Sequence, residues 1–289
     1  MTVLSPAVTP YGAAMPFVRT ASSLFPFLCF GLFGCGEPTV PAAVQTPQSV
    51  ADEPPGPREG TREWFRERLG LPDGVGGLEM VRGKVVVADL SQSEADSIAL
   101  LAGQPITRLG LIDTRVADLS AAAAMPLEDL YAKGSPVADL SPLRGKDLRE
   151  LDLIGCPVES LQPLAESKLG TLWLRQCPVT DLSPLAASEL VSLDVQDTGV
   201  ADLSPLASLT SLRRLNIAGT PVTDLTPLAS LRLERLIFTP SRITDGIDAI
   251  REMPTLTSID TSFDGEQPQA RPAAAFWTAY DAGEFAAED

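Results

Sequence analysis

The sequence predicts an α/β solenoid, in which one short unit repeats along the chain and builds a parallel β-sheet. Three observations predict it. An apolar residue opens each copy at intervals of 21 to 23 residues: Ile106, Leu127, Leu148, Leu169, Leu190, Leu212, Leu233 and Leu256. An alternating triplet such as Leu151-Asp152-Leu153 follows, and each copy closes with a return leg such as Leu161-Gln162-Pro163-Leu164. A fixed period of this length indicates stacked repeats.

The composition excludes several classes of function. The 289 residues include 22 Lys+Arg and 38 Asp+Glu, a net charge of −16, which argues against nucleic acid as a partner because phosphate binding needs clustered cations. The chain has no histidine, so Ser-His-Asp and Cys-His nucleophiles and His-ligated metals are excluded. Its four cysteines, Cys29, Cys35, Cys156 and Cys177, match neither a zinc site nor a disulfide scaffold. We expect no metal and no cofactor.

Residues 1–35 are predicted to be a signal peptide. The apolar run 24–34 is too short to span a membrane as a mature helix, and Arg19 precedes it. The run leads into Leu32-Phe33-Gly34-Cys35, which resembles the lipobox of bacterial lipoproteins. The resemblance implies that Cys35 is lipidated and becomes the mature N-terminus, although Phe33 departs from the small residue usual at its position. Simple secretion and an uncleaved anchor are the alternatives.

Two neighbouring features concern location and start. Gly36, rather than Asp, follows the cysteine, and by resemblance to Gram-negative lipoproteins this implies the outer membrane, with the folded part facing either the periplasm or the medium. Met15 is an alternative start that would give a shorter and more positive leader. Residues 36–60 are rich in proline and lack aromatics, so they cannot bury enough apolar surface to fold and are predicted to be a disordered linker.

A cap and a degenerate first repeat are predicted to open the folded part. Residues 61–77 contain a short helix that Thr61 can cap and Gly70 can end. Its apolar side chains would cover the first turn of the solenoid, because terminal repeats need a cover. The repeat domain is predicted to span residues 78–263. Within it, Ser91 or Ser93 is predicted to cap an α-helix that runs through Leu101.

Two segments are predicted to close the other end. Residues 245–253 have a helical pattern. Residues 264–289 are acidic and rich in alanine, and they form either a loosely docked tail or a closing helix around Phe276, Trp277 and Tyr280.

Each residue type in the repeat has a structural reason. In Leu151-Asp152-Leu153 the apolar side chains point into the core and the polar one points out, as a period of two requires. Most return legs carry Ser-Pro or Thr-Pro, which start a helical turn when Ser or Thr caps it and Pro follows. The space before the next strand admits about one turn, so we expect 3₁₀ rather than α-helix.

The repeat resembles the leucine-rich repeat of the short bacterial, internalin-like type. The resemblance covers roughly residues 78–263 and implies a horseshoe with the parallel β-sheet on its concave face and 3₁₀ or short helical turns on its convex face. The family usually places Asn on the turn after the strand. Here that position holds smaller residues instead: Thr114, Ser135, Cys156, Cys177, Thr198, Thr220 and Ser241.

Two repeated features suggest chemistry, but we assign them to the scaffold. One Asp recurs per copy, at Asp118, Asp139, Asp181, Asp202, Asp224 and Asp245. A ladder spaced by repeats does not converge on one ion, so these carboxylates are predicted to accept hydrogen bonds from nearby backbone. Cys156 and Cys177 lie one copy apart, within reach of a disulfide, but we favour two reduced, buried thiols because stacked side chains point in parallel.

The residues that vary between copies are the candidate binding site. The outward strand column is predicted to be Gly110, Tyr131, Asp152, Trp173, Asp194, Asn216, Ile237 and Asp260. Core packing does not require Tyr131, Trp173 or Ile237 to face outward, and exposed aromatics and arginines are typical of interface hot spots. Scattered surface residues are the competing interpretation. The positions we predict to bind a partner are Tyr131, Lys133, Glu150, Asp152, Ile154, Trp173, Arg175, Asp194 and Arg214.

These observations predict a non-catalytic, monomeric protein-binding module on a lipid anchor in the cell envelope. The resemblance to internalin-like proteins implies recognition of another protein through the concave sheet. A structural spacer of the envelope with no specific ligand is the alternative. An enzyme is the weaker hypothesis, because neither residues 36–77 nor the tail supplies a catalytic constellation.

Overall fold

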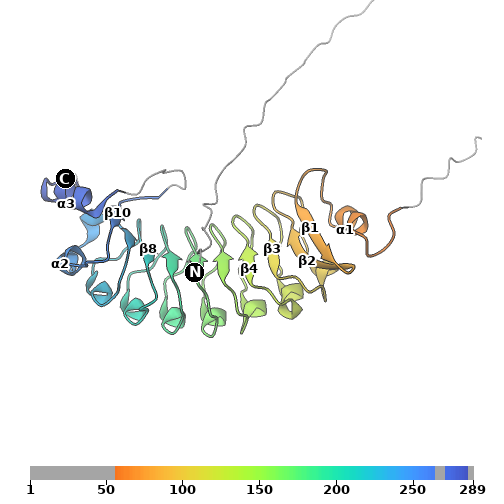
Figure 1. Ribbon diagram of the computed structural model, residues 1–289, viewed down its shortest axis with the longest axis horizontal. Coiled ribbons are helices and arrows are strands. Elements are labelled where there is room, and N and C mark those ends of the chain that lie inside the picture. Colours follow the sequence, from red (N-terminus) through yellow and green to blue (C-terminus); the bar gives the residue numbers. More distant parts are fainter. Residues whose placement is uncertain (1–55, 264–270, 286–289) are drawn as a thin grey trace, which may run out of the picture. The chain divides into compact units, whose positions relative to one another are not determined.

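The computed structural model describes residues 56–263 and 271–285, which form a curved solenoid (Figure 1). The signal segment, Cys35 and most of the linker lie outside the described residues. Ten strands form one sheet in chain order. They are β1 (Gly77–Val81), β2 (Lys84–Asp89), β3 (Arg108–Gly110), β4 (Asp129–Tyr131), β5 (Glu150–Asp152), β6 (Thr171–Trp173), β7 (Ser192–Asp194), β8 (Arg214–Asn216), β9 (Arg235–Ile237) and β10 (Ser258–Asp260). The strands β2 to β10 pair in parallel, each with the next.

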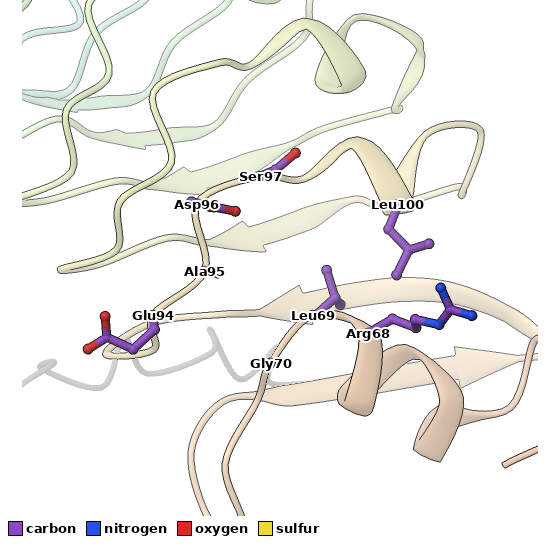
Figure 2. Close-up of a pocket in the computed structure, with 8 residues that line it drawn as sticks. All are labelled: Arg68, Leu69, Gly70, Glu94, Ala95, Asp96, Ser97 and Leu100. Atoms are coloured by element: carbon purple, nitrogen blue, oxygen red, sulfur yellow. The ribbon is translucent and has the colours of Figure 1, made fainter. Parts of the chain in front are cut away.

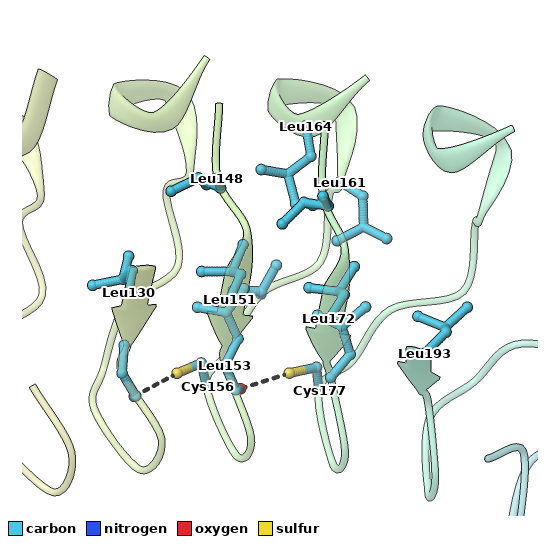
Figure 3. Close-up of a cluster of buried hydrophobic side chains, with 14 of the residues drawn as sticks. Leu130, Leu148, Leu151, Leu153, Cys156, Leu161, Leu164, Leu172, Cys177 and Leu193 are labelled. Atoms are coloured by element: carbon cyan, nitrogen blue, oxygen red, sulfur yellow. Dashed lines mark hydrogen bonds between the residues drawn. The ribbon is translucent and has the colours of Figure 1, made fainter. Parts of the chain in front are cut away.

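The strands stack because β3 to β10 each contribute one leucine or isoleucine to a continuous internal row, which Ala88 of β2 extends. Leu151 pairs in register with Leu172, and Leu172 with Leu193. Figure 3 shows these side chains lying side by side in a row that crosses the strands. All are buried at 0 or 1% exposure, as are the inward residues of the return leg such as Leu161 and Leu164. The predicted inward and outward alternation is therefore confirmed.

The return legs form 3₁₀ turns on the side opposite the sheet, as expected from the repeat length (Figure 1). They are η1 (Ala99–Leu101), η2 (Ser120–Ala124), η3 (Ser141–Leu143), η4 (Gln162–Leu164), η5 (Ser183–Leu185), η6 (Ser204–Leu206) and η7 (Thr226–Leu228). A further 3₁₀ turn, η8 (Pro240–Arg242), instead lies in the turn that follows β9. The expectation that Ser or Thr caps these turns is wrong. Ser141 is the first residue of η3, and its amide and hydroxyl both donate to Asp139, at 2.8 and 2.7 Å.

The repeated aspartates therefore cap the return legs. Asp118, Asp181, Asp202 and Asp224 accept a backbone amide two residues later in the same way. These hydrogen bonds hold the pKa of Asp118, Asp139, Asp181 and Asp202 below the usual value, because they stabilise the charged form. The predicted scaffold role is therefore confirmed for five of the six aspartates, namely Asp118, Asp139, Asp181, Asp202 and Asp224. Asp245 differs, since its carboxylate accepts from the Thr244 hydroxyl.

Small polar residues replace the asparagine ladder after the strands. Thr114, Ser135, Thr198 and Thr220 are buried, and each donates to the carbonyl oxygen three residues earlier, at 2.6 to 2.8 Å. The thiols of Cys156 and Cys177 instead donate to Ala132 and Leu153 of the preceding copy, both at 3.0 Å (Figure 3). Both thiols are free, as predicted. Burial raises the pKa of Cys156 to about 11 and that of Cys177 to about 12, so both stay protonated and unreactive.

The N-terminal end differs from the sequence expectation in two ways. The helix α1 (Arg62–Arg68) is capped by Thr61 as expected, since the Thr61 hydroxyl accepts the Trp64 amide, and the helix buries Phe65 against the core. Beyond it, β1 adds to β2 in antiparallel fashion, which the repeat pattern does not predict. The α-helix expected up to Leu101 is wrong. Only η1 forms there. Ser93 occupies the position that Thr114 and Ser135 hold in later copies, and its hydroxyl donates to the carbonyl oxygen of Leu90 instead of capping a helix.

The C-terminal end is closed by two helices, α2 (Ile247–Arg251) and α3 (Ala273–Asp281). The residues before α3 run antiparallel to β10, since the Ile259 amide donates to Arg271 at 3.0 Å and the Ala273 amide donates to Thr257 at 2.9 Å. Phe276 of α3 is fully buried, with its ring centroid 5.5 Å from that of Phe238. These contacts cover the last strand of the sheet.

Candidate functional site

The side chains that point away from the core lie on the concave side of the sheet, in two columns. The strand register aligns the predicted outward residues from Gly110 to Asp260, one per strand. A second column runs beside it from Arg108 through Asp129 and Glu150 to Arg235. Their environments divide this face into a half that is open and a half that is covered.

A charge cluster lies at the start of the face. The side chain of Asp129 is 4% exposed, and one of its oxygens accepts from Arg108 at 3.1 Å and from Arg149 at 3.0 Å. The two guanidinium groups compensate the buried carboxylate, which would otherwise be costly. Both arginines are more than half exposed, so they remain accessible to a partner.

The open patch adjoins this cluster and consists of Tyr131, Lys133, Glu150, Asp152, Ile154 and Trp173. The Tyr131 hydroxyl donates to Glu150 at 2.5 Å. Burial and this negative neighbour raise the pKa of Tyr131, so the phenol stays neutral. Lys133 is exposed, whereas Tyr131, Ile154 and Trp173 are half-buried. The patch therefore combines two aromatic side chains and an aliphatic one with charges of both signs.

Asp152 lies at the centre of the open patch. Its carboxylate accepts the Ile154 amide at 3.0 Å. Burial raises the pKa of Asp152, while the charges of Lys133 and Arg175 act in the opposite direction. A partner cation placed here would favour the charged form, so the site is suited to a basic or hydrogen-bond-donating group.

The other predicted binding residues fall in the covered half or at its edge. Asp194 points outward as expected, but it is 6% exposed and pairs with Arg175 at 3.0 Å. Ile237 is 5% exposed, so the expectation that it presents an apolar group to solvent is wrong. Arg214 is exposed. Asp194 is therefore engaged within the chain and unavailable for a direct contact.

Phe263, which follows β10, lies against the covered half of the concave face. The repeat pattern did not single out this residue. Its ring centroid lies 5.3 Å from the guanidinium carbon of Arg175 and 5.4 Å from that of Arg235. Arg235 in turn pairs with Asp260 at 3.0 Å. An aromatic residue immediately after the last strand was the available signal, but its position over the sheet depends on contacts between segments far apart in sequence.

Other parts of the described chain offer weaker sites. A cavity of about 280 Å³ lies beside the C-terminal end of α1, lined by Arg68, Leu69, Gly70 and residues 94–97 and Leu100 (Figure 2). It is small and lies at one end of the solenoid, away from the concave face. Across residues 56–263 and 271–285, no cluster of three metal-ligating side chains occurs. No helix within these same ranges is long and apolar enough to cross a bilayer.

Comparison with known proteins gives the class of fold. The family model for leucine-rich repeats, in two copies, matches residues 188–230. Among solved structures, internalin C2 from Listeria monocytogenes is 24% identical with a TM-score of 0.53, and the match covers 61% of this chain and 80% of that one. The ectodomain of the Arabidopsis receptor kinase HAESA, solved with a peptide hormone, is 21% identical with a TM-score of 0.54.

The HAESA match covers 64% of this chain but only 35% of the ectodomain. No curated protein matches the sequence. The chain therefore contains leucine-rich repeats and has the open solenoid fold of the leucine-rich-repeat proteins. At these identities the likeness shows the fold alone.

Proposed function

We propose that this chain is a non-catalytic binding module that recognises a protein partner through the open patch of its concave face. The observation that carries the proposal is the presence of Tyr131, Ile154 and Trp173 among charged residues on a rigid sheet, where core packing has no need of them. The HAESA ectodomain, which shares this fold, was solved in complex with a peptide ligand, and this supports a similar use here.

The test is Trp173→Ala in the full chain. We expect capture of the envelope partner by crosslinking to fall about tenfold or more, because a half-buried tryptophan on a binding face is typical of a hot spot. Val81→Ala is the matched control, since Val81 is 56% exposed and lies on β1, away from the patch. Equal capture by the wild type and the Trp173→Ala variant would contradict the proposal.

We also propose that Cys35 carries a lipid that anchors the module in the cell envelope. The Leu32-Phe33-Gly34-Cys35 sequence supports it, together with the proline-rich residues that follow and would act as a tether. Outer-membrane residence is the finer form of the proposal. The alternative of a spacer without a ligand predicts that crosslinking of intact envelopes captures no specific partner.

Cys35→Ser is expected to move the protein from the membrane fraction to the soluble fraction, because a diacylated N-terminus is required for stable anchoring. Mass spectrometry of the N-terminal peptide measures the modification directly. Cys29→Ser is the matched control, since Cys29 lies within the same apolar run and would be removed with the signal peptide. An unmodified Cys35 in the wild-type chain contradicts lipidation.

A further inference from the structure

The ring of Phe263 lies over strands to which it does not belong. Arg175 reaches Asp194 on β7, and Arg235 reaches Asp260 on β10. Because the ring contacts both guanidinium groups, it lies between these two ion pairs. The intervening strands β8 and β9 present Asn216 and Ile237 in the outward column. Each is 5% exposed, although its side chain points away from the core.

These residues make a preformed site with two cationic walls. The Nε atoms of Arg175 and Arg235 are buried and have no hydrogen-bond partner among the described residues. A guanidinium that loses water on one side is stabilised by the π face of a ring, and the attraction strengthens as the pair is desolvated. Asp194 and Asp260 hold the two guanidinium groups in place, at 3.0 Å each. We assign its floor to Asn216 and Ile237, which are paired in register on β8 and β9 and are each 5% exposed.

We propose that Arg175, Arg235, Asn216 and Ile237 form a binding site for an aromatic ring, which Phe263 fills within its own chain. A partner enters this site by displacing Phe263 with an aromatic side chain of its own. The second step rests on the function proposed above, whereas the first does not. The concave face then has two parts: the open patch is always accessible, and the ring site becomes accessible only when Phe263 leaves.

Thiol labelling of the full chain in the absence of any partner tests the site. Ile237→Cys places a thiol on its floor, and mass spectrometry reads the rate of reaction with N-ethylmaleimide at that position. We expect Phe263→Ala to raise this rate by at least about tenfold, because two ring–guanidinium contacts are lost. Asp152→Cys, in the open patch, is the matched control and should react at the same rate with or without Phe263.

The buried Cys156 thiol reports whether the solenoid itself opens. The proposal is overturned if the rate at position 237 is unchanged by Phe263→Ala, or if it rises only together with the rates at position 152 and Cys156. Phe263→Leu is the second variant. Leucine fills similar volume without a ring, so it should protect position 237 less well than phenylalanine, and equal protection overturns a site specific for rings.

A soluble probe tests the ligand class. In the Phe263→Ala variant, N-acetylphenylalanine amide at millimolar concentration should slow labelling at position 237, and N-acetylleucine amide should not. Equal effects of the two amides overturn the aromatic assignment. All these measurements are made without a partner. A failure of Trp173→Ala to reduce partner capture would therefore contradict the proposed function and leave the ring site standing.

Discussion

Leu172→Ala is expected to lower the free energy of unfolding by about 2–5 kcal/mol, the range for truncating a fully buried leucine. Leu172 is 0% exposed and lies in the middle of the internal row, in register with Leu151 on one side and Leu193 on the other. A cavity there weakens the packing of one repeat against both neighbours. Because a solenoid is stabilised mainly by contacts between adjacent repeats, neither end can compensate for the loss.

Equilibrium unfolding in urea measures the loss. Thr171→Ala is the matched control, because Thr171 lies on the same strand, is half-buried and points away from the core. It should cost less than about 1 kcal/mol, the span of β-propensity. A cost for Leu172→Ala as small as that for Thr171→Ala would mean that the central row does not carry the stability of the fold.

The central repeats could be predicted from sequence because one pattern recurs and each copy packs only against its neighbours. The period located the strands, and the alternation within Leu151-Asp152-Leu153 located the core side. The prediction failed at the N-terminal end of the repeats, where Ser93 and the residues after it have the local pattern of a helix start. Stacking prevailed there, since the Ala95 carbonyl accepts the Arg115 amide of the next copy. Local propensity is a weak prior when tertiary hydrogen bonds compete with it.

The sequence predicted which side chains of the candidate site point away from the core, but not which of them are exposed to solvent. Residue spacing placed Trp173, Asp194 and Ile237 in one outward column, and the register agrees. It did not reveal that Phe263 lies over part of that column, because this contact joins Arg175 to a residue beyond the last strand. A period carries information about neighbouring copies and none about a segment that follows the last strand and has no counterpart in the other copies.

Phe276→Ala is expected to lower the free energy of unfolding by about 3–5 kcal/mol, the range for truncating a buried phenylalanine. Phe276 is 0% exposed, and its ring centroid lies 5.5 Å from that of Phe238 and 4.9 Å from that of Phe285. It also fixes α3 at the end of the solenoid, so its loss weakens the backbone pairing that covers β10.

The consequence reaches beyond stability, because an uncovered edge strand offers unpaired amides and carbonyls to another chain. Phe276→Ala should therefore lower the melting temperature and also produce oligomers in sedimentation velocity. Thr278→Ala is the control, since Thr278 is exposed on the same helix and its replacement leaves the buried ring intact. A Phe276→Ala variant that melts like the Thr278→Ala variant and remains monomeric would show that α3 is not needed to close the solenoid.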